Sequence, residues 1–219
     1  MPEFFLCVIR NKHTETTTPS VDNLSQGKPE SGVSFMQKDG SVQASINMGL
    51  KMVDRTHPDY VGLQILSTAL GGYFGSRLMK NIREEKGYTY GIRSSFEGDA
   101  YSGRFSISSA VKRSSTALSV AEILKEFNRY VKEGITEDEL QFTKSSLLNQ
   151  EALKYEAPMQ KASFLYNIQR FELPADYTKK QNELLNSMTR ADVNAQIVKS
   201  FLPSQLTTVI VGDRYIIES

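Results

Sequence analysis

The chain has 219 residues, with 26 Lys and Arg against 25 Asp and Glu, which gives a formal net charge of +1. This length is enough to bury a substantial core, and the near-neutral charge supplies no basic field, so nucleic acid is not expected as a partner. A single cysteine, Cys7, excludes an intrachain disulfide framework and a Cys-rich metal site without indicating a compartment.

Residues 1–40 are predicted to be an N-terminal strand and a polar linker that precede one main domain, residues 41–219. The apolar run at residues 4–9 is too short for a signal peptide or a membrane span, so we expect a strand with Cys7 as a small buried hydrophobe. Residues 11–32 are rich in Thr, Ser, Pro, Asn and Gly, which is typical of a linker or a long loop. A linker so near the start suggests that the chain is a fragment, or one half of something larger.

A sheet is expected to begin at Val42, where apolar and polar residues start to alternate with the period of a half-buried strand. A helix is predicted from Pro58 to Leu70, ended by Gly71 and Gly72. The next helix is expected to stop near Gly87 in a left-handed cap, and its inward side chains are predicted to be Phe74, Leu78, Met79 and Ile82.

Two further strands, at about residues 88–96 and 102–110, are predicted to form an antiparallel hairpin across Gly98 and Asp99. A long amphipathic helix should follow over about residues 115–133, with Gly134 as its C-terminal stop. Its core-facing stripe is predicted to comprise Leu118, Ala121, Leu124, Phe127 and Val131.

The rest of the chain is predicted to be mainly helical. Capping patterns begin helices at Thr136 and Thr189, Pro158 and Pro174 interrupt the helical material between them, and residues 206–211 form a last strand. The order of elements indicates an α+β fold, a two-layer α/β sandwich whose mixed, mostly antiparallel sheet has helices packed on one face. Phe164, Tyr166 and Phe171 are expected in the core, with a partner surface as the alternative.

Arg83 and Tyr90 are the candidate functional pair, seven residues apart at a helix-to-strand corner. A guanidinium and a phenol are donors suited to a peptide carbonyl or to the oxyanion formed when that carbonyl is attacked. The residues alone also allow structural roles, because Arg83 could pair with Glu84 or Glu85 and Tyr90 could be an ordinary strand aromatic. Period two places Tyr88 on the same face as Tyr90.

Six phrases carry a family resemblance: VQASINMG, HPDY with ILSTALGG, SRLMKNIREEKGYTYG, GITEDEL followed by Lys144, LPADY and VIVGD. Over about residues 42–213, the chain resembles the second, non-catalytic domain of the pitrilysin family of zinc peptidases. This family includes insulin-degrading enzyme and mitochondrial processing peptidase.

The resemblance implies a domain that closes like a clamshell on a second domain or subunit of the same family. That partner would carry the HxxEH motif and the zinc ion. This chain would carry no cofactor, because its only histidines, His13 and His57, belong to no such motif. By motif match, Arg83 and Tyr90 would hold the scissile carbonyl of a peptide substrate.

The chain is therefore not expected to be active alone. The alternative is a structural or assembly module of the same family without a peptidase role. A homodimer of the isolated domain is also possible, because a surface suited to another domain would be exposed. Nucleotide binding is not expected, since no Gly-Lys-Ser/Thr follows the Gly71-Gly72 pair. Membrane binding is not expected either, because the apolar run at residues 4–9 is too short to span a bilayer.

Overall fold

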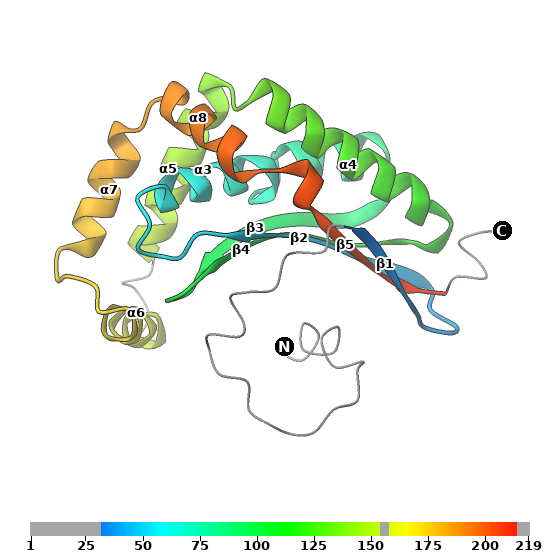
Figure 1. Cartoon of the computed structure of the whole chain (residues 1–219), viewed down its shortest axis with the longest axis horizontal. Helices are drawn as coiled ribbons and strands as arrows, with labels where there is room; N and C mark the ends of the chain where they lie inside the picture. The colour runs from blue at the N-terminus through cyan, green and yellow to red at the C-terminus, as the bar shows by residue number, and fades with distance from the viewer. Residues whose placement is uncertain (1–31, 154–157, 214–219) are drawn as a thin grey trace.

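The computed structural model describes residues 32–153 and 158–213. In this part of the chain, helices cover one face of a single sheet, which confirms the predicted two-layer fold (Figure 1). The predicted strand at residues 4–9, Cys7 and His13 lie outside the described residues. No helix in the described ranges combines the length and the apolar character that crossing a membrane requires.

The sheet has five strands in the order β1-β5-β2-β4-β3. Their bounds are β1 Gly32–Gln37, β2 Gln43–Met52, β3 Thr89–Gly98, β4 Gly103–Lys112 and β5 Thr207–Gly212. β1 pairs in parallel with β5, and the other neighbours are antiparallel, so the sheet is mixed and mostly antiparallel as predicted. β3 and β1 form its two edges.

The sheet begins earlier than predicted, because β1 precedes Val42. This strand is an edge strand whose side chains are mostly exposed, and Val33 in it is 64% exposed. Its neighbour β5 lies at the other end of the chain. A strand that buries so little and pairs so far along the sequence leaves only a weak local pattern.

The main helices are α3 Tyr60–Gly71, α4 Thr116–Glu133, α5 Glu137–Leu153, α6 Pro158–Arg170, α7 Tyr177–Ser187 and α8 Arg190–Ser200. A π-helix, η1, spans Met79–Glu85, and two short 3₁₀ turns, η2 Arg113–Ser115 and η3 Pro203–Gln205, precede α4 and β5. Helices α3, α4 and α8 lie over the sheet, whereas α6 and α7 extend to one side (Figure 1).

The core forms between the sheet and the helices above it. Ala44, Ile46 and Met48 of β2 are buried while the residues between them are exposed, which confirms the predicted alternation from Ala44 onward. Val42, where the alternation was expected to begin, is 83% exposed. Phe105 of β4 faces an aromatic cluster, with ring centroids 4.8 Å from Phe201 and 6.0 Å from Phe127. These rings join the sheet to α4 and to the end of α8.

The inward stripe of α4 agrees with the prediction only in part: Phe127 is buried, and Leu124 and Val131 pack against the core. The buried residues of the helix are Thr116, Ser119, Ile123, Glu126, Phe127 and Tyr130. Leu118, predicted to face the core, is 58% exposed. The buried stripe is thus offset around the helix from the predicted one. It includes polar residues that have hydrogen-bond partners: Ser119 donates to the Ser115 carbonyl, and Glu126 accepts from Asn81.

Both predicted capping patterns are confirmed. At the start of α5, the Glu139 carboxylate accepts from the Thr136 N–H at 2.8 Å, and the Thr136 hydroxyl accepts from the Glu139 N–H at 3.2 Å. Thr189 and Asp192 form the same reciprocal pair at the start of α8. These exchanges satisfy donors that a helix start would otherwise leave unpaired.

The predicted core role of the aromatic residues around α6 is wrong for Tyr166, which is 59% exposed. Phe164 and Phe171 are half-buried. Nothing in α6 is fully buried, because the helix lies at the side of the molecule rather than over the sheet (Figure 1).

Candidate functional site

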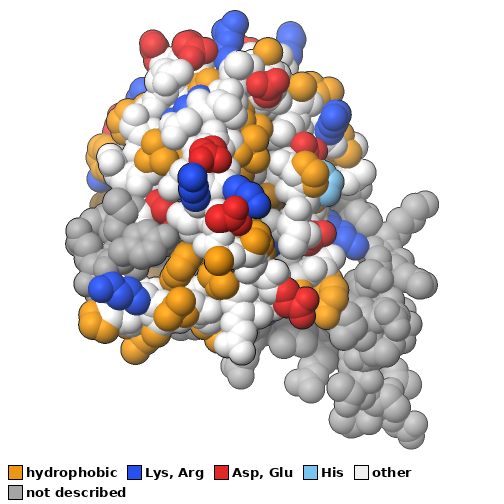
Figure 2. Space-filling view, turned by 90° about the vertical axis from the view of Figure 1, so that its left-hand side faces the viewer, with side chains coloured by type: hydrophobic (Ala, Val, Ile, Leu, Met, Phe, Trp, Pro, Cys, Tyr) orange, Lys and Arg blue, Asp and Glu red, His pale blue; other side chains and the backbone are white. Residues whose placement is uncertain are grey.

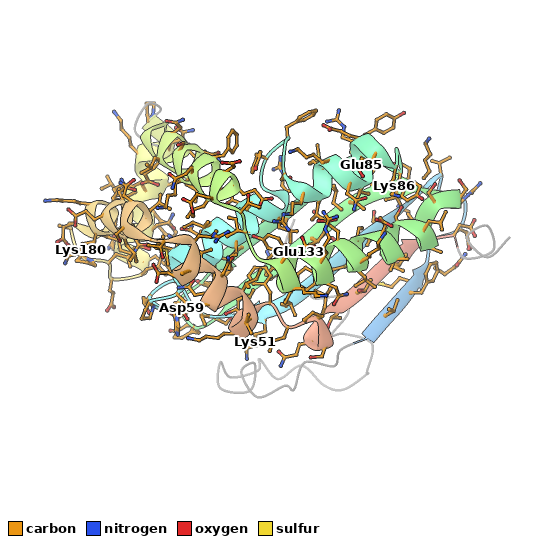
Figure 3. All side chains as sticks on the ribbon, turned by 90° about the horizontal axis from the view of Figure 1, so that it is seen from above. Lys51, Asp59, Glu85, Lys86, Glu133 and Lys180 are labelled. Carbon is orange, nitrogen blue, oxygen red and sulfur yellow. The ribbon has the colours of Figure 1, made fainter. Side chains whose placement is uncertain are left out.

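The candidate site forms where η1 turns into β3. Gly87 has φ +64°, and its N–H donates to the Arg83 carbonyl at 3.1 Å, while the Tyr88 N–H donates to the Ile82 carbonyl at 3.1 Å. This confirms the predicted left-handed glycine at the corner, a conformation that costs glycine little. Figure 3 shows Glu85 and Lys86 at this corner, far from Lys180 on α7.

The π-helix η1 is held by hydrogen bonds to α4. Asn81 donates to the Glu126 carboxylate at 2.9 Å and to that of Glu122 at 3.2 Å. The hydrogen bond from Asn81 is the main reason that the pKa of Glu122 lies below its ordinary value. Ile82 is fully buried, so the segment carrying Arg83 is fixed by polar and apolar contacts together. π-helical turns are frequent at functional sites.

Arg83 does not take the structural role that its sequence context allows. Within the described residues its guanidinium forms no ion pair with Glu84, Glu85 or any other carboxylate. It lies instead over the ring of Phe74, with the guanidinium carbon 4.4 Å from the ring centroid.

Phe74 was predicted to point inward, but it is 62% exposed. It lies in the connection between α3 and η1, not in a helix that faces the core.

Tyr90 projects from β3 and is 84% exposed. The pairing of β3 with β4 is irregular between Thr89 and Ile92, where Tyr90 and Gly91 form a bulge. The prediction that Tyr88 shares a face with Tyr90 is wrong, because Tyr88 packs against the core. The bulge breaks the period of two, and bulges commonly redirect a side chain in this way.

Two buried hydroxyls hold the bulge. The Thr89 hydroxyl lies 2.6 Å from the Ala110 carbonyl and accepts from the Gly91 N–H at 3.1 Å. The Ser109 hydroxyl is 3.0 Å from the Gly91 carbonyl and 3.1 Å from the Thr89 hydroxyl. This network was not predicted from the sequence. The sequence feature that could have indicated the bulge is Gly91, directly after Tyr90, since a glycine within a strand often marks a bulge.

An open cleft of about 660 Å³ lies beside the corner. Its walls come from the start of the connection after α3, from η1 and from β2, β3 and β4; they include Tyr73, Phe74, Met79, Gly91 and Arg93. Arg83 and Tyr90 are not lining residues, but each adjoins one, Arg83 through Phe74 and Tyr90 through Gly91. The structure therefore places both predicted residues at the surface, at one corner and next to one cleft.

The described residues do not fit a zinc site. They contain no group of three or more His, Cys, Asp or Glu side chains able to hold a metal ion. His57, the histidine among them, accepts from the Asp59 N–H at 3.1 Å through Nδ1 and lies in the turn before α3. A hydrolytic zinc needs about three protein ligands, so no step of catalysis is assigned to a metal on these residues.

Lys144, which follows one of the family phrases, has a structural explanation. Lys144 is 8% exposed, and its ammonium donates to the carbonyls of Asn186 at 2.9 Å and Met188 at 2.5 Å. It thereby satisfies carbonyls at the C-terminal end of α7, where a cation is also favoured by the helix dipole. Lys144 is a support for the fold and not a site residue.

Comparison with known proteins gives consistent matches. A family model described as the peptidase M16 inactive domain matches residues 10–147. The "Non-peptidase homolog YmxG" of Helicobacter pylori is 31% identical over 160 residues, which cover 71% of this chain and 36% of that protein. An uncharacterized zinc protease of Streptomyces coelicolor is 31% identical over 102 residues, covering 45% of this chain and 21% of that protein.

A solved structure agrees. The crystal structure of a peptidase M16 inactive domain from Pseudomonas fluorescens superposes with a TM-score of 0.78 at 25% identity, covering 85% of this chain and 45% of that one. These matches confirm the family resemblance drawn from the sequence. The chain spans less than half of each of these three proteins.

Proposed function

The chain belongs to the peptidase M16 family, as an inactive domain of that family, and from this premise we propose that it is the substrate-holding half of a zinc metalloendopeptidase. The other half, a domain or subunit bearing HxxEH, holds the zinc ion and activates water for attack on the peptide bond. Arg83 and Tyr90 donate hydrogen bonds to the substrate carbonyl and to the oxyanion that develops on it.

One observation carries this proposal: two strong donors project at a single corner beside an open cleft. The Arg83 guanidinium has no carboxylate partner among the described residues, and the Tyr90 side chain is 84% exposed. A structural arginine is normally paired, and a structural tyrosine normally packs its ring. Donors held in place before the reaction stabilise an oxyanion without reorganisation at the moment of attack.

The test is turnover of a peptide by the chain reconstituted with its HxxEH-bearing partner. Arg83→Ala and Tyr90→Phe should each lower kcat about 100-fold, the effect of removing one oxyanion donor, while the thermal transition of the chain stays unchanged. Tyr101→Phe is the matched control, since Tyr101 is similarly exposed at 82% but lies in the β3–β4 turn. Wild-type turnover in both site variants would remove the proposed role.

A second candidate is a structural or assembly module. The Helicobacter relative is named a non-peptidase homolog, and α6 exposes the large apolar side chains of Met159, Leu165 and Tyr166. Figure 2 shows hydrophobic side chains gathered low on this side of the molecule, over α6. Such a surface favours association, either with a partner of the same family or as a homodimer of this chain. If this is the function, α6 variants disturb assembly while Arg83→Ala and Tyr90→Phe have no effect.

A further inference from the structure

The connection between α3 and η1 is fixed at its start by close packing. A Cβ on Gly71 would lie 2.6 Å from the backbone nitrogen of Ser94, and one on Gly72 would lie 2.6 Å from the Cα of Thr68. Only glycine allows the chain to pass so close to β3 and α3. The path of the backbone is thus set immediately before Tyr73 and Phe74.

The next residue, Tyr73, holds the connection from the other side. Its ring centroid lies 4.5 Å from that of Phe142 on α5, within the range of favourable aromatic pairs. Phe74 is therefore flanked by an anchored residue, although its own ring is 62% exposed and lines the cleft. Its ring contacts a cation at the site, because the Arg83 guanidinium carbon lies 4.4 Å from its centroid.

We propose that Phe74 is a positioning residue that holds the Arg83 guanidinium beside the cleft through a cation–π contact. This inference rests on the proposed function of Arg83. Carboxylates are the usual means of fixing an arginine, but a carboxylate would occupy the donors and neutralise the charge. A ring attracts the cation without accepting its in-plane N–H groups, so the donors stay free for a substrate oxygen.

The contact also restricts a flexible side chain. A free arginine side chain samples many rotamers, and each must be frozen when the oxyanion forms. A guanidinium that is already held over a ring loses less freedom on binding, and this is the advantage of a group fixed in advance. The expected benefit is modest, because an exposed cation–π pair contributes about a two- to fivefold effect on an equilibrium or a rate.

The first experiment needs no enzyme activity. In NMR spectra of the full chain, the Arg83 δ-methylene protons should be shifted upfield by the ring current of Phe74. Phe74→Leu should move them to the positions of an unstacked arginine, and Phe74→Tyr should restore the shift. Phe142→Leu is the matched control, because Phe142 belongs to the same aromatic group but contacts Tyr73 instead.

The second experiment measures peptide turnover with the HxxEH-bearing partner. Phe74→Leu should lower kcat about two- to fivefold, Phe74→Tyr should recover it, and Phe74→Leu should have no further effect in an Arg83→Ala background. The last arm separates positioning of Arg83 from a direct contact between Phe74 and the substrate.

Two outcomes overturn the proposal: Arg83 resonances that do not move in Phe74→Leu, or a Phe74→Leu effect that persists undiminished in the Arg83→Ala background. Failure of the proposed function is a separate result, seen as unchanged turnover in Arg83→Ala itself. In that case the NMR experiment still decides whether Phe74 holds the guanidinium.

Discussion

At the scale of single residues, the site depends on how two exposed side chains are presented. Arg83 is held over an aromatic ring and not by a carboxylate, and Tyr90 is turned outward by a bulge in β3. Both arrangements leave polar groups accessible that an ordinary fold would pair or pack. The hydroxyls that hold the bulge, those of Thr89 and Ser109, are buried and form hydrogen bonds within β3 and between β3 and β4.

Thr89→Val should destabilise the bulge. Valine keeps the shape of the side chain but removes the hydroxyl near the Ala110 carbonyl and the Gly91 N–H. Leaving such buried groups without a partner costs about 1–3 kcal/mol, so the free energy of unfolding in urea should fall by that amount. Ser108→Ala, at an exposed neighbouring position on β4, should change it by less than about 0.5 kcal/mol. Equal stability of Thr89→Val and wild type would show that the hydroxyl does not hold the bulge.

At the scale of elements, one partly buried ion pair joins three segments. The Arg77 guanidinium donates to Glu139 at 2.6 and 2.7 Å and to the Gly134 carbonyl at 2.8 Å. It thus connects the residues just before η1 to the end of α4 and the start of α5. Burial by itself would raise the pKa of Glu139, but the bonds from Arg77 and Thr136 hold it below the ordinary value of 4.5. The position of the helix that carries Arg83 therefore depends on this carboxylate being ionised.

Glu139→Gln should reduce stability in a pH-dependent way. A carboxyl with a lowered folded-state pKa contributes stability above its unfolded pKa and loses it as the pH falls through the folded value. At pH 7 the variant should be about 1–3 kcal/mol less stable. Below pH 4.5, the ordinary value, the wild type should lose stability more steeply than the variant, and the two curves should converge.

Unfolding in urea at a series of pH values checks this prediction. Glu97→Gln is the control, because Glu97 pairs with Arg104 on the surface, where both side chains are about half-exposed or more, at 66% and 47%. An exposed pair of this kind contributes little. Parallel curves for Glu139→Gln and wild type across the acid range would contradict the role assigned to the Arg77–Glu139 pair.

At the scale of the whole molecule, the sheet and the helices above it form one compact layer pair, whereas α6 lies aside with apolar residues exposed. Met159 and Leu165 are 77% and 64% exposed.

We expect the isolated chain to self-associate through α6. Met159→Glu combined with Leu165→Glu should shift the chain to monomer, as measured by sedimentation velocity over a concentration series. Gln169→Glu adds a charge to an exposed polar position of the same helix and should not. A wild-type chain that stays monomeric throughout would contradict this expectation.

The sequence by itself determined the elements whose signals are local. The alternation in β2, the capping pairs at Thr136 and Thr189 and the glycine at position 87 depend on residues a few positions apart, so the pattern is sufficient to read them. The family phrases likewise identified the fold. They also singled out Arg83 and Tyr90, although composition and spacing alone left structural roles open for both.

Only the tertiary structure decided how those residues are presented. The position of β1 in the sheet is set by its pairing with β5, near the other end of the chain. Polar contacts to η1 help to set the face of α4, close packing at Gly71 fixes the chain shortly before Phe74, and hydroxyls on β3 and β4 hold the bulge at Tyr90. Each is a contact between segments distant in sequence, and such contacts have no period or motif along the chain.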